Sequence, residues 1–228
     1  MIVILDIGST LIDGPPIGPA RRIAEALGLG REHVPELERL LFCTAVCDAD
    51  QLGFEVSARM GVDAALAVQT ARSLWDAQLR EAFVLPGARE AIDSLKAAGV
   101  PRAYLSNIWP PFYQRFAREF AEEAAECPQF LSFRTGLMKP DAAFFRLAMN
   151  TLGVQASDAV VVGDTYDNDI LPAIELGMRT VWVLHRPAKE RDALVRVLNG
   201  SAPKPEFTRG SIGELANGIL WKSANTSC

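Results

Sequence analysis

The stretch Met1-Ile-Val-Ile-Leu-Asp6-Ile-Gly8-Ser-Thr10 opens the chain and decides how the rest of it folds. Its apolar residues run without polar interruption into Asp6, which is typical of a strand buried on both faces of a parallel sheet. Asp6 then stands at the carboxyl end of that strand, where open α/β sheets place their ligands. If Asp6 is a nucleophile, the chain should also supply a cation, a phosphate-binding group and a second acid.

Length and composition limit the possible folds and partners. The chain has 228 residues, 49% of them hydrophobic, which suits one large domain or one domain with a smaller insertion. The net charge is −5 and the basic residues are scattered, so we expect neither nucleic acid nor a membrane surface as a partner. No apolar run is long enough to span a bilayer, and a core strand stands where a signal peptide would be.

The cysteines also bear on location. Cys43, Cys47, Cys127 and Cys228 lack the four-ligand spacing of a structural zinc site. We therefore expect free thiols and a cytoplasmic protein.

Residues 15–83 show helical patterns only. Gly14-Pro15-Pro16 marks a hinge after the first strand. Apolar spacing then predicts helices around residues 23–27 and 37–41, and a longer one over residues 63–80. No strand is expected in this block.

From Leu85 onward, expected helices and strands alternate. This alternation predicts an α/β fold, with a Rossmann-like parallel sheet covered by helices on both faces. The expected strands are Arg102–Ser106, Phe130–Phe133, Ala159–Val162, Thr180–Leu184 and an edge strand near Phe207. The expected helices are Ala88–Ala98, one opening at Trp109, Asp141–Leu152, Asp167–Leu176, one from about Ala188 and a short one near the end.

Polar residues follow the expected strands, and their types fit phosphoryl transfer to Asp6. A carboxylate attacking a phosphate dianion costs about 4 kcal/mol per like-charge pair at ~4 Å and an effective dielectric near 20. Mg²⁺ held by the oxygens of Asp6, Asp164 and Asp169 would remove that obstacle. Lys139 would keep Asp6 ionised, and Ser106 would donate to a phosphate oxygen.

Four motifs in order resemble those of the haloacid dehalogenase-like (HAD) hydrolase superfamily. They are the opening Asp6–Asp13 stretch, Leu105-Ser106-Asn107, Lys139-Pro140, and Gly163-Asp164 through Asp169. The resemblance implies a core of residues 1–14 and 84–228, with residues 15–83 as an inserted helical C1 cap. It also implies a Mg²⁺-dependent phosphatase acting on a small phosphomonoester.

The resemblance further implies a role for each motif residue. Asp6 would be the nucleophile and a metal ligand, and Ser106, Asn107 and Lys139 would hold the phosphate. The metal ligands would be Asp6, the backbone carbonyl of Gly8, Asp164 and Asp169. Thr10 would support the loop.

Gly8 departs from the phosphatase pattern, in which this position carries an Asp that acts as general acid and base. Such catalysis contributes about 10²–10⁴-fold. The sequence therefore predicts a slow phosphatase, one for activated leaving groups, or one with a different proton carrier.

Three alternatives stay open. A binding or regulatory protein that kept the fold without useful catalysis is the main rival because of Gly8. A metal-independent 2-haloacid dehalogenase shares Ser106-Asn107, but Asp164 argues for a metal. A response-regulator-like receiver has its Lys last, whereas Lys139 precedes Asp164 here.

Other polar residues have simpler interpretations. We expect Asp13 to be a turn residue and Asp167 a helix N-terminal acid. His185 and Arg22 are assigned to packing or to the surface, and Trp75 to helix packing.

Overall fold

The computed structural model describes residues 1–217, and its core is a six-stranded sheet in the order β5-β4-β1-β6-β7-β8. All neighbouring strands pair in parallel, which confirms the expected α/β class. The strands are β1 (Ile2–Leu5), β4 (Arg102–Ser106), β5 (Gln129–Leu131), β6 (Ala159–Gly163), β7 (Arg179–Val183) and β8 (Phe207–Arg209).

Helices cover both faces of the sheet, as the uninterrupted apolar character of β1 predicts. Val3 and Leu5 face one hydrophobic cluster, and Ile2 and Ile4 face another. The first cluster includes side chains of α5 (Ala88–Ala97), α6 (Pro110–Glu119) and α7 (Ala121–Glu126). The second includes side chains of α9 (Ala142–Leu152) and α10 (Leu171–Glu175).

Shorter elements complete the described core. They are α8 (Ser132–Thr135), α11 (Arg191–Leu198), the helical turns η2 (Ala156–Asp158), η3 (Tyr166–Ile170) and η4 (Ile212–Asn217). The expected helix over residues 167–176 is thus divided into a π-helical turn and the short α10.

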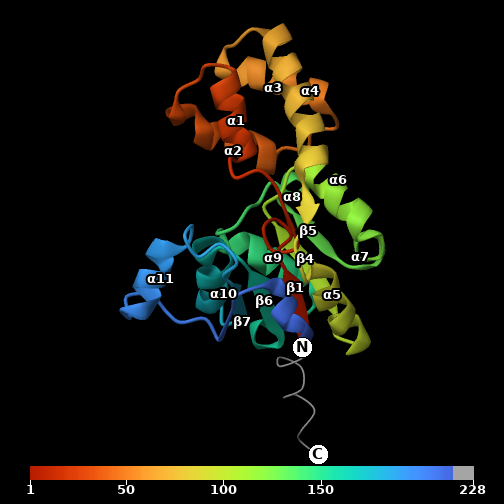
Figure 1. The fold of residues 1–228 in the computed structure, drawn as a ribbon, viewed down its shortest axis with the longest axis vertical. Helices are drawn as coiled ribbons and strands as arrows, with labels where there is room; N and C mark the ends of the chain where they lie inside the picture. Colours follow the sequence, from red (N-terminus) through yellow and green to blue (C-terminus); the bar gives the residue numbers. More distant parts are fainter. Residues whose placement is uncertain (218–228) are drawn as a thin grey trace, which may run out of the picture.

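A helical insert, residues 19–81, stands at one end of the sheet (Figure 1). It contains α1 (Pro19–Ala26), η1 (Arg31–His33), α2 (Val34–Cys43), α3 (Ala49–Met60) and α4 (Ala64–Glu81). α3 was not expected from the sequence. Its Asp48 cap accepts a hydrogen bond from the Gln51 backbone N–H, and the helix ends at Gly61 in the left-handed conformation.

The insert joins the core through paired chain segments. β2 (Ile12–Asp13) and β3 (Phe83–Val84) form a short antiparallel ladder where the chain leaves and re-enters the core. α4 packs against α6, and α2 packs against α8. Trp75 meets Trp109 edge to face with ring centroids 5.8 Å apart, as its assignment to packing expects.

None of the helices in residues 1–217 combines the length and the apolar character needed to cross a bilayer. Cys43, Cys47 and Cys127 are free thiols, as expected, and Cys228 lies outside the described residues.

A buried ionic network ties α7 to β4. Glu123, 3% exposed, accepts hydrogen bonds from Arg102 at 2.9 and 3.0 Å and from the Tyr104 hydroxyl at 2.6 Å. Burial would raise the pKa of Glu123, but hydrogen bonds from Arg102, Tyr104 and Cys127 outweigh it and hold the pKa below its ordinary value. Glu123 therefore stays ionised although it is buried.

We expect Glu123→Gln to lower the free energy of unfolding by about 2–4 kcal/mol, because it leaves Arg102 without its charged partner. Chemical denaturation measures the loss. Glu122→Gln is the control, because Glu122 pairs with Lys96 at the surface and should cost less than about 0.5 kcal/mol. Because the folded-state pKa of Glu123 is lowered, its contribution should be present above pH 4.5 and disappear as the pH falls below it. Equal losses in both variants would contradict this account.

Candidate active site

Residues from three neighbouring strands meet at the carboxyl edge of the sheet. Leu5 lies level with Tyr104 on one side and Val162 on the other. Asp6 follows β1, Ser106 ends β4, and Asp164 follows β6. The parallel register therefore brings these sequence-distant residues to one place, as the sequence predicts.

Lys139 joins two of the acids. Its Nζ donates to Asp6 Oδ1 at 2.7 Å and to Asp169 Oδ1 at 2.5 Å. All three side chains are at least nine-tenths buried. Thr10 Oγ1 lies 3.3 Å from the other Asp6 oxygen, which agrees with a loop-supporting place for Thr10.

Asn107 positions Lys139. Its side-chain amide donates to the Lys139 carbonyl at 2.8 Å and accepts from the Lys139 backbone N–H at 2.8 Å. These two bonds engage the polar atoms that the resemblance assigns to phosphate binding. The Ser106 hydroxyl, in contrast, is buried without a hydrogen-bond partner among the described residues.

Gly163 makes room for Asp169. A Cβ at residue 163 would lie 2.4 Å from Asp169 Cγ, so any side chain there would displace the carboxylate. The Thr165 backbone N–H donates to Asp169 Oδ2 at 3.0 Å. The glycine and the loop together fix Asp169 beside Lys139.

The local electrostatics follow from burial and crowding. Burial, together with the charge of Asp6, raises the pKa of Asp164 to about 6. Burial also raises the pKa of Asp169 to about 7, although Lys139 opposes the shift. The charges of Asp169 and Asp6 outweigh burial at Lys139 and raise its pKa, so the ammonium stays charged.

The acids fit a hard divalent cation. One carboxylate oxygen from each of Asp6, Asp164 and Asp169 lies within 4.8 Å of the others. Oxygen donors at this spacing suit Mg²⁺. Burial and the charges of the neighbouring acids raise the two pKa values, and a cation would offset both effects.

Arg186 also lies in this site, although the sequence interpretation missed it. Its Nη2 donates to Asp164 Oδ2 at 2.5 Å, and its Nη1 lies 3.6 Å from Asp13 Oδ1. Arg186 comes three residues after β7, so its position past a strand end was a usable signal.

Asp13 is held in place by several partners. Its carboxylate accepts from the Gly14 backbone N–H at 2.9 Å and lies 3.5 Å from His185 Nε2. Burial would raise the pKa of Asp13, but His185, Gly14 and Arg186 outweigh it and lower the pKa. Asp13 is therefore ionised at neutral pH and is a poor proton donor.

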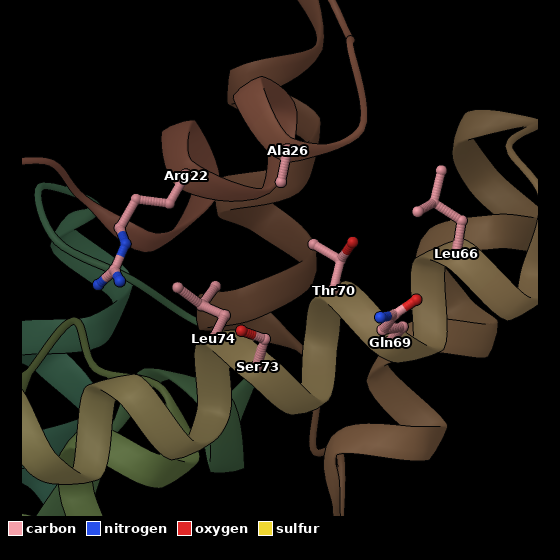
Figure 2. A pocket seen from close by; sticks show the side chains of 7 residues that line it. All are labelled: Arg22, Ala26, Leu66, Gln69, Thr70, Ser73 and Leu74. Atoms are coloured by element: carbon pink, nitrogen blue, oxygen red, sulfur yellow. The ribbon is translucent and has the colours of Figure 1, made fainter.

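A cleft of about 350 Å³ opens over the acids. Asp6, Gly8 and Lys139 line it from the core, and Phe42 and Gln78 line it from the insert. A separate groove lies between α1 and α4, where Arg22, Gln69 and Leu74 are among the lining side chains (Figure 2). Arg22 pairs there with Glu81 at 2.6 Å.

Asp167 is not in the cleft-lining set. It forms an ion pair with Arg196 at 2.7 Å, which joins η3 to α11.

A comparison with family models identifies the superfamily of this chain. Residues 1–177 match the model of the haloacid dehalogenase-like hydrolase family. The chain belongs to this family. The HAD assignment made from the four motifs is therefore confirmed.

Several of the curated relatives are named as phosphatases. Ribulose-1,5-bisphosphate 5-phosphatase of Halopiger xanaduensis is 32% identical over 119 residues, which are 52% of this chain and 49% of that protein. Phosphoserine phosphatase of Thermus thermophilus is 32% identical over 124 residues, or 51% of this chain and 48% of that one. The chain thus spans about half the length of these relatives.

The chain shares its fold with a solved dehalogenase structure. A 2-haloacid dehalogenase from Pseudomonas syringae aligns with a TM-score of 0.61 at 21% identity, covering 95% of this chain and 97% of that one. This likeness establishes the HAD fold, and the chemistry has to be argued from the site.

Proposed function

We propose that this HAD hydrolase is a Mg²⁺-dependent phosphatase of small phosphomonoesters. The observation that carries the proposal is that Asp6, Asp164 and Asp169 converge around one place. Lys139 donates hydrogen bonds to Asp6 and Asp169 there. The phosphatase names of the sequence relatives support the same reaction. A metal-independent dehalogenation gives no reason for this set of three acids.

In the proposed reaction, an Asp6 carboxylate oxygen bonds to phosphorus as the ester P–O bond breaks. The leaving group departs as an alkoxide and takes a proton from solvent to become the alcohol. Water then attacks the aspartyl phosphate, releasing inorganic phosphate and restoring the Asp6 carboxylate. Lys139 offsets negative charge near Asp6, and the unpartnered Ser106 hydroxyl is placed to donate to a phosphate oxygen.

The metal would be held by Asp6, Asp164, Asp169 and the Gly8 carbonyl. It would supply charge stabilisation for the phosphoryl group. We propose residues 15–83 as the cap that closes the cleft, because insert side chains line it opposite Asp6. Closure would exclude bulk water during the first transfer.

Hydrolysis of 4-nitrophenyl phosphate tests the function. We expect release of nitrophenol with Mg²⁺ and at least a ~10²-fold slower rate with excess EDTA, because the clustered acids would then repel the phosphate. Restoring Mg²⁺ should restore the rate. A panel of metabolite phosphates would then rank substrates.

Two outcomes would overturn the proposal. Metal-independent halide release from 2-chloropropionate would identify a dehalogenase. Saturable binding of phosphate esters without any turnover would favour the binding protein that Gly8 suggests.

A further inference from the structure

α4 carries a polar residue where its apolar stripe calls for a packing residue. Ala67, Ala71, Leu74 and Trp75 are buried at helical spacing, and Gln78 continues the same stripe. Gln78 is only 4% exposed. A departure from the packing pattern at a buried position points to a functional use of the side chain.

The Gln78 amide is unpartnered within residues 1–217, where neither its oxygen nor its nitrogen makes a hydrogen bond. Its side chain lines the cleft that also contains Asp6 and Lys139. The amide atoms stay open to the cleft, so a ligand bound there can supply the hydrogen bonds that no neighbouring residue in this range makes. The position of Gln78 and its lack of a partner together indicate that a ligand in the cleft is its hydrogen-bond partner.

Gly14 leaves space for this amide. A Cβ at residue 14 would lie 3.2 Å from Gln78 Nε2 and 3.5 Å from the Phe112 ring. A Cβ at Gly8 would lie 3.4 Å from the opposite edge of the same ring. Gln78 therefore reaches the loop that follows Asp6, on the insert side of the nucleophile.

We propose that Gln78 determines specificity by hydrogen-bonding the alcohol portion of the substrate. The substrate is then a small phosphomonoester that carries a hydroxyl or carbonyl oxygen beside the ester. This inference rests on the proposed phosphatase function. The amide is no acid, so Gln78 binds and orients the leaving group without replacing the proton carrier that Gly8 lacks.

The test uses Gln78→Met with glycerol 3-phosphate and propyl phosphate, which share a three-carbon chain and differ in hydroxyl groups. Wild type should prefer glycerol 3-phosphate in kcat/KM, and the variant should lose about 10- to 100-fold on that ester with little change on propyl phosphate. The rise in unfolding temperature with each ester gives a binding readout that needs no turnover.

Gln69→Met is the matched control. Gln69 lies on the same helix, is exposed, and lines the separate groove in Figure 2. Its substitution should leave the preference between the two esters unchanged.

Stability separates a binding role from a structural one. Gln78→Met removes an amide that has no partner, so the ligand-free unfolding temperature should stay the same or rise. A clear fall, or an unchanged ester preference, would overturn the inference. If propyl phosphate is hydrolysed while the preference is unaffected, the inference fails and the phosphatase function stands. If neither ester is turned over but 4-nitrophenyl phosphate is, the phosphatase function stands, and the binding and stability measurements decide the role of Gln78. If 4-nitrophenyl phosphate is not turned over either, the function fails, and the same measurements still decide that role.

Discussion

Asp6→Asn should lower kcat for any phosphomonoester by about 10³-fold or more, because an amide oxygen is a poor nucleophile and cannot form the aspartyl phosphate. The fold should survive, since Lys139 keeps its hydrogen bond to Asp169 at 2.5 Å. Steady-state kinetics with 4-nitrophenyl phosphate measure the loss. In the wild type, rapid quenching and peptide mass spectrometry should find one phosphoryl group on the peptide that contains Asp6.

Asp13→Asn is the control for this experiment. Asp13 lines the same cleft, but its carboxylate accepts a hydrogen bond from the Gly14 backbone N–H and lies beside His185. Its loss of activity should be far smaller than that of Asp6→Asn. Comparable losses, or turnover that persists in Asp6→Asn, would remove Asp6 from the role of nucleophile.

Gly8→Asp should raise kcat for an unactivated alkyl phosphate by at least about 10-fold, because general acid–base catalysis contributes roughly 10²–10⁴-fold. The Cβ of the new side chain fits, since it would lie 3.4 Å from the Phe112 ring, an ordinary contact distance. The backbone at residue 8 is outside the left-handed region, so the substitution brings no backbone strain there.

The size of the gain should depend on the leaving group. Nitrophenolate leaves readily without a proton, so 4-nitrophenyl phosphate should gain less than propyl phosphate. Gly8→Asn is the control, because it matches the shape without an ionisable group. An equal effect in both variants, or no gain in a folded Gly8→Asp protein, would show that the lack of an acid at residue 8 does not limit the rate.

Much of the fold and the acid cluster was predictable because it depends on local patterns. The buried run ending at Asp6 predicts a central parallel strand, and β1 lies between β4 and β6. Asp164 and Asp169 follow another buried run, Ala159–Gly163, and a carboxylate oxygen of each lies within 4.8 Å of one from Asp6. Parallel strands share one carboxyl edge, so the sequence positions of these acids were enough to bring them together.

Other features were not predictable because their signals are weak or depend on distant segments. α3 has a mixed apolar pattern, with Phe54 exposed, so its periodicity was missed. β2 and β3 have two residues each and exist through pairing with one another. Arg186 follows a strand end in the sequence, but only its contact with Asp164 singles it out.

The sequence by itself determined the α/β class, the helical insert and the HAD family motifs, with Gly8 in the first of them, because each is written in adjacent residues or in spacing along the chain. The tertiary structure decided which polar atoms already have partners. It engages Asn107 with the Lys139 backbone and leaves the amide of Gln78 without a partner at the cleft. Hydrogen bonding between distant residues depends on how the insert and the core pack, and no local pattern encodes that packing.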